Sequence, residues 1–245
     1  MSVRPEPRHD RQPSAEVVTT PAAMIPSREP LVGRYSVVEP IDPDRHGAEL
    51  FAATRDGEGA ERIWDYLPYG PFASKAAFQE WLVERATSAD PLFYALRDLQ
   101  SGRASGMASC LNIFPANGSI EIGHIWFGIR LQKTPAATEA LFLMMGHVFD
   151  ALHYRRLEWK CNALNAGSRR AAVRLGFAFE GIFYQHMIVK GCNRDTAWFA
   201  ILDHEWPRLR ANFETWLDEA NFDANGEQRT SLSTLNLAVR RADPA

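Results

Sequence analysis

One stretch of this sequence limits the possible folds more than any other, and it runs from Gln132 to Ala140. The apolar residues before it alternate as in a strand, and those after it recur at helical spacing and form one buried stripe. The strand residues are Ile120, Ile122, Ile125 and Phe127, and the helix residues are Leu141, Phe142, Met145, Val148, Phe149 and Leu152. A strand, a tight turn and a helix start direct backbone N–H groups and a positive helix terminus toward one point, which suits a phosphate.

A second strand and helix follow this unit. Residues Leu157 to Cys161 alternate apolar and polar, which predicts a strand with one buried face. The next helix begins near Ser168 and ends at Leu175, and Gly176 suits the left-handed conformation of a helix C-cap. The strand–helix–strand order at the centre of the chain requires a parallel strand pair.

The motifs in this region resemble those of the GNAT acetyltransferases. Residues Gln132 to Ala137 resemble the Q/R-x-x-G-x-G/A pyrophosphate loop of that family, and residues Asn162 to Gly181 follow its order N-x-x-N-x-x-S, helix, G-F-x-x-E-G. Thr138-Glu139-Ala140 is similar to the ribosomal-protein N-terminal acetyltransferase branch. The sequence departs from the family at Pro135, which stands at the first Gly position, has no N–H group and cannot take a positive φ.

The resemblance implies an α/β fold with a mixed, mostly antiparallel sheet, helices on both faces and a central splayed parallel strand pair. Short hairpin turns elsewhere in the sequence agree with antiparallel neighbours. In the family, the pantetheine arm of the cofactor lies in the gap between the parting strands. An unpaired amide in that gap can hydrogen-bond the thioester carbonyl, and here it would belong to the strand His124-Ile125-Trp126-Phe127.

The cosubstrate implied by the resemblance is acetyl-CoA, with no metal. Family knowledge makes Asn165 a polar contact of the pantetheine or phosphate arm and places the Ser168 hydroxyl near the sulfur. From residue type alone, Asn165 is a helix N-cap and Ser168 a first-turn residue, and both descriptions can hold together. The residues expected to bind the cofactor are Trp126, Phe127, Gln132, Lys133, Thr134, Ala136, Ala137, Thr138, Asn165 and Ser168.

Acetyl transfer to an amine needs the amine neutral and a group, or a water that the group polarises, to take its proton. Glu121 lies on the strand face opposite Ile120 and Ile122, so it is either at a cleft or in an ion pair. In the ribosomal-protein branch a base has been proposed near the position of Met187, which cannot accept a proton. The residues expected to act in catalysis are Glu121, Ser168, Tyr184 and His186, with His124 and Asp195 as further proton acceptors to consider.

Three features on the acceptor side have simpler structural interpretations. The aromatic stretch from Trp64 to Phe72 forms either a rim for the acceptor or a plug over the sheet. His186 is either catalytic or a half-buried strand histidine with a hydrogen-bond partner. Arg194 and Asp195, in the last hairpin, are most simply an ion pair in a turn.

Composition restricts the class of protein and its partners. The chain has 245 residues, of which 46% are hydrophobic, and its net charge of −3 does not favour nucleic-acid binding. No apolar run reaches the length of a membrane span, and the three cysteines match neither a metal site nor a disulfide framework. We therefore expect a cytoplasmic protein that binds neither nucleic acid nor membranes, and we allow for a homodimer.

The sequence divides into three parts and leads to a functional hypothesis. We expect a flexible arm at residues 1–30, the acetyltransferase domain at residues 31–207, and a C-terminal helix with a loosely held tail at residues 208–245. The hypothesis is an acetyl-CoA-dependent N-acetyltransferase acting on a primary amine, either a protein N-terminal α-amine or an aminoacyl small molecule. Two alternatives stay open: an antibiotic or polyamine N-acetyltransferase, and a non-catalytic acyl-CoA-binding module.

Overall fold

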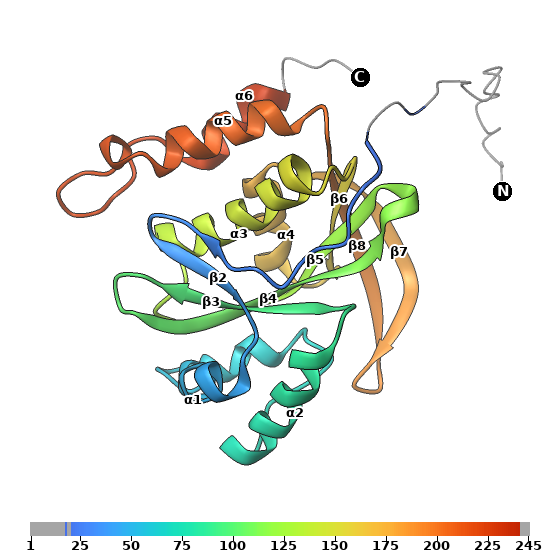
Figure 1. Ribbon diagram of the computed structural model, residues 1–245, viewed down its shortest axis with the longest axis vertical. Coiled ribbons are helices and arrows are strands. Elements are labelled where there is room, and N and C mark those ends of the chain that lie inside the picture. Colours follow the sequence, from blue (N-terminus) through green and yellow to red (C-terminus); the bar gives the residue numbers. More distant parts are fainter. Residues whose placement is uncertain (1–17, 19–20, 241–245) are drawn as a thin grey trace, which may run out of the picture.

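An eight-stranded sheet forms the centre of the computed structural model, which describes residue 18 and residues 21–240. The strands are β1 (Leu31–Val32), β2 (Ser36–Pro40), β3 (Leu92–Asp98), β4 (Arg103–Phe114), β5 (Ser119–Phe127), β6 (Arg156–Asn162), β7 (Ala178–Val189) and β8 (Cys192–Leu202). In space they follow the order β1-β2-β3-β4-β5-β6-β8-β7 (Figure 1). Within the described chain, β5 and β6 are parallel and every other neighbouring pair is antiparallel.

Helices cover both faces of this sheet. The helices are α1 (Pro43–Ala53), α2 (Lys75–Thr87), α3 (Pro135–Gly146), α4 (Ala166–Leu175), α5 (Trp206–Leu217) and α6 (Leu232–Arg240), with short helical segments η1 (Ala60–Trp64), η2 (Pro115–Asn117), η3 (His147–Ala151) and η4 (Glu219–Asn221). Figure 1 shows α1 and α2 on one side of the sheet and α3 to α6 on the other. This arrangement confirms the predicted α/β architecture. In the described residues, no helix combines the length and the apolar character that a bilayer crossing requires.

Each face of the sheet has its own hydrophobic cluster. On the side of α3 to α6, Ile120 and Ile122 are buried in the larger cluster, as the strand pattern predicts. On the side of α1 and α2, the cluster includes Phe93 and Trp126. Because side chains alternate along a strand, Glu121 points to the face opposite its two isoleucine neighbours.

Side-chain caps fix where four helices begin. An oxygen of each cap residue accepts a hydrogen bond from a backbone N–H in the first turn, which satisfies a donor that the helix itself leaves unpaired. Ser74 caps α2, since its Oγ atom accepts a hydrogen bond from Ala77 N at 3.1 Å. The other three caps are Asp42 for α1, Thr134 for α3 and Asn165 for α4. The starts of α3 and α4, which border the site described below, are therefore set by local sequence.

A buried carboxylate in α3 holds the turn between β1 and β2. Glu139 Oε1 accepts a hydrogen bond from Arg34 N at 2.8 Å. Glu139 Oε2 accepts from Tyr35 N at 2.7 Å, from Ser36 N at 2.7 Å and from Ser36 Oγ at 2.9 Å. A Cβ atom on Gly33 would lie 2.4 Å from Glu139 Oε2, so the turn admits no side chain there. This contact joins residues about a hundred positions apart and fixes α3 against the sheet edge.

The described ends of the chain contact the domain. Met24 N donates to Leu152 O at 2.9 Å, and Arg28 Nη2 donates to Ser88 O at 2.6 Å. At the other end, Leu232 is fully buried, and Asn236 Nδ2 donates to Arg174 O at 2.8 Å. Met24 and Arg28 of the expected arm, and Leu232 and Asn236 of the expected tail, therefore contact the domain. The expected C-terminal helix corresponds to α5. Residues 1–17, 19–20 and 241–245 of the expected arm and tail lie outside the described residues.

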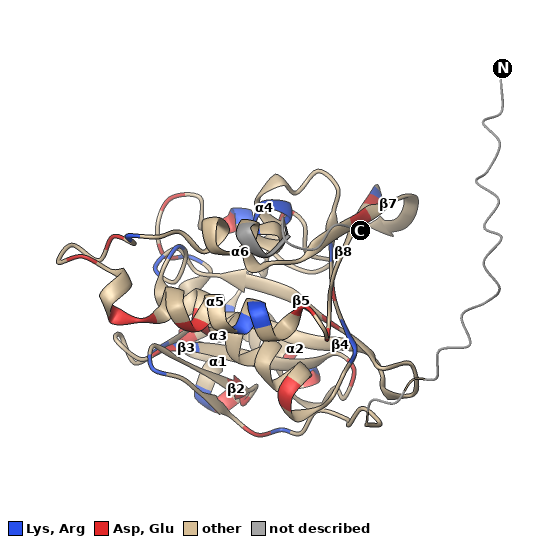
Figure 2. Cartoon of the chain, turned by 90° about the horizontal axis from the view of Figure 1, so that it is seen from above, with Lys and Arg blue, Asp and Glu red and all other residues tan. Residues whose placement is uncertain are grey.

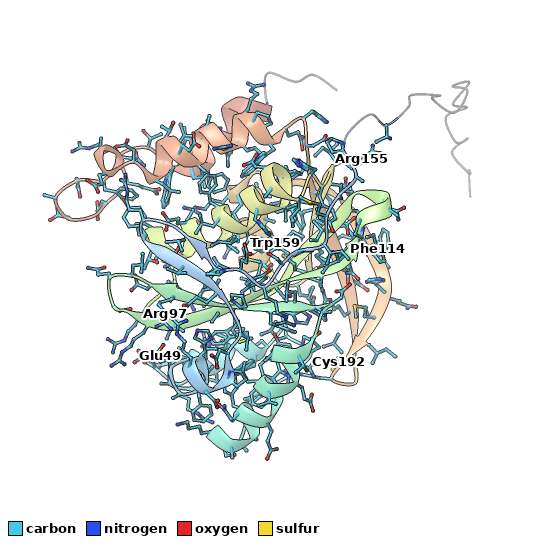
Figure 3. All side chains as sticks on the ribbon, in the orientation of Figure 1. Glu49, Arg97, Phe114, Arg155, Trp159 and Cys192 are labelled. Carbon is cyan, nitrogen blue, oxygen red and sulfur yellow. The ribbon has the colours of Figure 1, made fainter. Side chains whose placement is uncertain are left out.

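A buried ion network links β2, α1 and β3. Glu39 Oε2 accepts from Arg97 Nε at 2.7 Å and lies 3.2 Å from His46 Nε2. Arg97 also pairs with Glu49 at 3.2 Å, and Figure 3 shows these two side chains together beside α1. His46 Nδ1 accepts from Asp42 N, so the imidazole proton lies on Nε2 and faces Glu39. The imidazole is therefore hydrogen-bonded on both nitrogens in its neutral form.

We expect Glu139→Gln to lower the free energy of unfolding by about 2 kcal/mol or more, because an amide cannot accept all four hydrogen bonds and turns N–H groups toward buried donors. Urea denaturation measures the effect. Glu80→Gln, on the exposed face of α2, is the matched control and should change stability little. Equal stability of the two variants would contradict the role given to Glu139.

The network around Glu39 predicts that acid weakens the fold. Burial lowers the pKa of His46 from its ordinary 6.5, although Glu39 opposes this. Burial raises the pKa of Glu39, but the hydrogen bond and charge of Arg97 outweigh it and hold the pKa below 4.5. Both groups therefore bind protons less readily in the folded chain, so stability falls as pH drops, first below 6.5 and then below 4.5.

Melting temperatures at about pH 7.5 and about pH 5.5 test this linkage. The melting temperature of the wild type should be lower at the acid pH. His46→Gln removes the first titrating group, so its melting temperature should change less over the same interval. A wild-type melting temperature that rises on acidification would overturn the sign of the effect.

Candidate active site

The central parallel strands pair only at one end. The register of β5 with β6 stops at Glu121 and Glu158, although β5 continues to Phe127 and β6 to Asn162. Beyond that point the two strands part, which leaves backbone groups on their facing edges without a ladder partner. The predicted splayed pair is therefore present, and its fork lies at Glu121.

Four polar side chains meet at this fork. Parallel pairing sets Glu121 opposite Glu158, two acids that would repel each other across neighbouring strands. Lys160 Nζ lies 3.0 Å from Glu121 Oε2 and 2.7 Å from Glu158 Oε2, so one cation holds both. Asn112 Nδ2 donates to Glu121 Oε2 at 2.6 Å, and the Lys160 ammonium lies 4.0 Å from the centre of the Trp198 ring. Glu121 is 5% exposed, so it is the buried ion-pair member that the sequence allowed for.

The two acids at the fork differ in proton affinity. Burial raises the pKa of Glu121 above its ordinary value, and the opposing influence of Lys160 and Asn112 does not cancel this. Burial acts in the same direction on Glu158, but its hydrogen bonds with Lys160 and Arg156 prevail and lower its pKa. A carboxylate with a raised pKa is the better proton acceptor, so Glu121 is the more basic of the pair.

A bulge changes the course of β5 just beyond the fork. Met107 of β4 pairs with Trp126, and Ser109 pairs with Gly123, so two residues of β5 stand opposite one of β4. The extra residue is accommodated by His124, whose φ is +52°. The amides of the bulge lie on the part of β5 from which β6 has already parted.

The His124 side chain lies among aromatic rings on the α1 and α2 side. Its imidazole stacks on Tyr69 with 5.5 Å between ring centres, and its Nδ1 is buried without a hydrogen-bond partner. Burial, assisted by the charges of Arg85 and Arg194, lowers the pKa of His124 to about 4. The imidazole is therefore neutral near pH 7 and is a weak proton acceptor.

The loop before α3 has the geometry of a helix N-terminus that is open to an anion. In the family loop, the first Gly can take a positive φ, and Pro135 stands at that position. In this chain the positive φ is found at Lys133, where it is +61°. Pro135 is the first residue of α3, where its missing N–H costs nothing. Pro135 is therefore compatible with a tight turn in this loop, because the turn is made two residues earlier, at Lys133.

Fewer amides of this loop are free than the sequence predicts. Ala137 N donates to Thr134 Oγ1 at 3.2 Å, and Thr138 N points to Thr134 O at 3.4 Å. Within the described chain, the amides of Lys133, Thr134 and Ala136 have no partner in the loop or the first turn. Three of the backbone donors predicted for a phosphate are therefore available to an anion, and phosphate binding by residues 132–138 stays a prediction.

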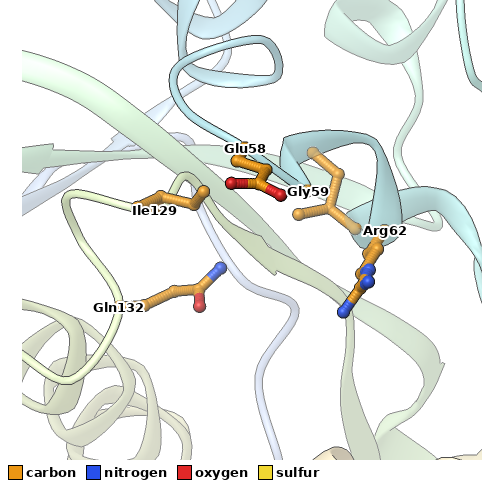
Figure 4. Close-up of a pocket in the computed structure, with 6 residues that line it drawn as sticks. Glu58, Gly59, Arg62, Ile129 and Gln132 are labelled. Atoms are coloured by element: carbon orange, nitrogen blue, oxygen red, sulfur yellow. The ribbon is translucent and has the colours of Figure 1, made fainter.

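A polar hollow adjoins the same loop. It has a volume of about 470 Å³ and lies between the segment before η1 and the turn after β5. Figure 4 shows the Glu58 and Arg62 side chains on one side of it and Ile129 and Gln132 on the other. Gln132 Nε2 also donates to Phe127 O at 2.9 Å, which ties this side chain to the end of β5.

Comparison with known proteins agrees with this geometry. The Acetyltransferase (GNAT) domain family matches residues 37–178. The chain is 49% identical to a GCN5-related N-acetyltransferase from Brucella melitensis, with a TM-score of 0.86, over 89% of this chain and 97% of that one. It is 39% identical to a probable acetyltransferase of the GNAT family from Chromobacterium violaceum, with a TM-score of 0.74, over 80% and 98%. This chain belongs to the GNAT acetyltransferase family.

The resemblance to the ribosomal-protein branch is weaker at the level of structure. The solved structure of RimL, a ribosomal L7/L12 alpha-N-protein acetyltransferase, is 20% identical, with a TM-score of 0.60 over 71% of this chain and 94% of that one. At that identity the likeness concerns the fold alone. No curated protein sequence matches the chain.

The second motif of this acetyltransferase has a structural function. Asn165 Oδ1 accepts from Ser168 N at 2.9 Å, which makes Asn165 the N-cap of α4. Ser168 Oγ accepts from Trp159 Nε1 at 2.9 Å, and Figure 3 shows Trp159 near the centre of the molecule. The cap description of Asn165 is therefore confirmed, and whether either residue contacts a cofactor stays a prediction.

Three other predicted site residues are not members of the polar cluster at the fork. Tyr184 is 75% exposed, and it belongs to an irregular stretch where β7 carries extra residues opposite β8. His186 Nδ1 lies 3.0 Å from Thr196 Oγ1, as expected for a strand histidine with a partner. The Trp126 side chain is buried under α1 and α2, which leaves only its backbone for a cofactor in the gap.

The aromatic stretch before α2 is mainly a plug. The Trp64 ring lies 5.8 Å from that of Trp126, and both belong to the cluster on the α1 and α2 side. Two hydrogen bonds also connect this stretch to other segments. Tyr66 Oη donates to Leu164 O at 3.3 Å, and Lys190 Nζ donates to Trp64 O at 2.8 Å. The stretch therefore bridges to both the β6–α4 loop and the β7–β8 hairpin.

Two residues at the site were missed or misinterpreted from sequence. Lys160 was overlooked, although a lysine two residues after a glutamate on a half-buried strand indicates a shared polar face. Arg194 was expected to pair with Asp195, but in the described residues they form no ion pair. Asp195 Oδ1 instead accepts from Gln185 N at 2.7 Å and from Asn193 Nδ2 at 3.0 Å.

Charge is otherwise distributed without a dominant sign. Figure 2 shows acidic and basic residues interspersed over the described chain. In that part of the molecule, no three His, Cys, Asp or Glu side chains gather in a way that could hold a metal ion.

Reversing the charge at Lys133 tests the loop. Lys133 is exposed, so Lys133→Glu should leave the fold intact while weakening acetyl-CoA binding by about tenfold, because a carboxylate then repels the phosphates. Calorimetric titration with acetyl-CoA measures this. Lys75→Glu, equally exposed at the start of α2, is the control and should bind acetyl-CoA as the wild type does. If both variants bind alike, the phosphates are held elsewhere.

Proposed function

We propose that this acetyltransferase moves the acetyl group of acetyl-CoA to a primary amine by direct attack within a ternary complex, with Glu121 taking the amine proton. The observation that carries the proposal is the raised pKa of a buried carboxylate at the fork of two parting parallel strands. The acceptor that we favour is an α-amine, either at a protein N-terminus or on an aminoacyl small molecule.

The residues present suit acetyl-CoA. The amides of Lys133, Thr134 and Ala136 are grouped at the N-terminus of α3, where the helix dipole favours a pyrophosphate. The gap beyond Glu121 offers strand edges to an amide-bearing arm such as pantetheine. Bound there, acetyl-CoA would supply an acetyl group activated as a thioester.

The reaction forms a nitrogen–carbon bond and breaks a carbon–sulfur bond, and it places three demands on the protein. Negative charge develops on the carbonyl oxygen, and the amides of His124 and Ile125 in the bulge are the donors that we assign to it. Charge also develops on the departing sulfur, for which we assign the Ser168 hydroxyl. The amine must finally lose a proton.

Glu121 is suited to take that proton because of its neighbours. When Glu121 is protonated, Lys160 keeps Glu158 as its counter-ion at 2.7 Å, so no buried ammonium is left unpaired. Burial favours the neutral form of Glu121, which makes proton uptake less costly than at an exposed carboxylate. His124 is too weak a base to take the amine proton in place of Glu121, since burial lowers the pKa of His124 to about 4.

The preference for an α-amine follows from the same proton balance. A free α-amine has a pKa near ~8, against ~10.4 for a lysine side chain, so a far larger fraction is neutral at physiological pH. The sequence similarity of Thr138-Glu139-Ala140 to the ribosomal-protein branch supports this choice of acceptor.

Glu121→Gln should lower kcat/KM by about 100-fold, because the group that takes the proton is lost. It should also remove the acid limb of the pH profile, which is the fall of kcat/KM at low pH that protonation of Glu121 causes. Acetyl-CoA affinity should be unchanged. Glu158→Gln is the matched control: it also removes one partner of Lys160, but it should keep the acid limb. Identical pH profiles in the two variants would show that the effect comes from Lys160 and that Glu121 is not the base.

A further inference from the structure

Arg194 is the charged residue near the fork that remains without a counter-ion. It lies in β8, where it pairs with Met187 of β7, and the residue two positions on, Thr196, pairs with Asn162 at the end of β6. Trp198, two positions further, faces the Lys160 ammonium. Because side chains alternate along a strand, Arg194 shares the face of β8 that carries the fork cluster.

The Arg194 guanidinium is half-buried and has no hydrogen bond or ion pair with another described residue. Its Nε atom is shielded from solvent and unpartnered. The two nearby acids have other partners. Asp195 accepts hydrogen bonds from Gln185 N and Asn193 Nδ2. Glu121 pairs with Lys160 and accepts a hydrogen bond from Asn112. A half-buried cation whose shielded Nε atom has no partner is suited to an anion that arrives with a ligand.

The Arg194 guanidinium interacts electrostatically with groups on both strands that part. Burial lowers the pKa of Arg194, and the opposing influences come from Cys161 on β6 and Glu121 on β5, the two strands that part. His124 at the β5 bulge is also within the field of Arg194. Because Arg194 also shares the strand face of Trp198, which contacts Lys160, its charge lies within electrostatic range of the proposed base.

We propose that Arg194 binds a carboxylate carried by the acceptor amine. This inference rests on the proposed function and narrows its acceptor to molecules with an amine and a nearby carboxylate. The amine would approach Glu121 while the carboxylate meets the planar N–H fork of Arg194, which matches a carboxylate in two parallel hydrogen bonds. Trp198 Nε1, buried without a partner on the same strand face, is a second donor for the same group.

The cofactor phosphates do not account for this cation. The three free amides of the phosphate loop lie at the start of α3, which packs on the opposite side of the sheet from the Lys160 and Trp198 face. A neutral site would be served by an asparagine or glutamine without the desolvation cost of a guanidinium. A charged partner that arrives with the acceptor removes that cost.

Matched acceptors test the proposal in the wild-type protein. Glycine, β-alanine and γ-aminobutyrate vary the distance between amine and carboxylate, and the amide of each removes the charge. A second arm compares peptides that begin with Asp or Glu with peptides that begin with Asn or Gln. In one of the two arms, we expect kcat/KM to be about 10- to 100-fold higher for the acceptor with the carboxylate than for its amide. The arm that shows this preference identifies the acceptor as a free amino acid or as a peptide with an acidic N-terminal residue.

Variants of Arg194 then connect that preference to the residue. Arg194→Gln should abolish the preference while leaving turnover of the amide acceptors and acetyl-CoA affinity as in the wild type. Arg194→Lys keeps the charge but not the fork, so it should retain part of the preference. Arg103→Gln, exposed on β4, is the control. Equal losses for acid and amide acceptors in a folded Arg194→Gln protein would overturn the proposal.

The outcomes separate this inference from the proposed function. If the wild type acetylates charged and uncharged acceptors equally well, the carboxylate site is wrong and the N-acetyltransferase function stands. If the wild type binds acetyl-CoA and acetylates no amine in either arm, the proposed function itself fails. In the event that Arg194→Gln does not fold, the wild-type comparison of acids with amides still decides the question.

Discussion

The site depends on one constraint: two parallel strands pair for three residues and then part at a point where two acids face each other. Lys160 makes that register tolerable, since it contacts both Glu121 and Glu158. The same lysine compensates the two negative charges at the point where the strands part. The gap, the basic carboxylate and the bulge therefore lie next to one another along β5, and the helices position the remaining groups around them.

Much of the fold was readable from the sequence because local rules and tertiary packing agree. Residues Leu157 to Cys161 lie in a strand, as their alternation predicts, and α4 ends at Leu175 with Gly176 in the left-handed conformation. The isoleucines around Glu121 face α3 as alternation requires. The strand–helix–strand order predicted the parallel pair and the family resemblance implied its fork, whereas the location of the fork at Glu121 comes from the register.

The rest of the site depends on contacts between distant segments, which local patterns do not encode. Lys160 meets Glu121 only once the register of β5 and β6 is set. The expected pairing of Arg194 with Asp195 relied on sequence adjacency, whereas neighbouring strand residues point to opposite faces. The tight turn of the phosphate loop lies at Lys133 because Thr134 caps α3, a shift that the family pattern hides. Helix α6 was missed because the burial of Leu232 and the partial burial of Leu235 depend on the completed domain.

The outer strand β7 has a consequence for self-association. It is a twelve-residue edge strand, and such an edge is normally a template on which another chain extends the sheet. Two irregularities interrupt its register with β8, one near Gly181 and one around Gln185, where φ is +50°. A strand bent twice cannot present a straight row of N–H and C=O groups to a second copy. Any dimer that uses this edge must therefore be built from side chains such as Phe183 and Ile188, and would be sensitive to their polarity rather than to backbone pairing.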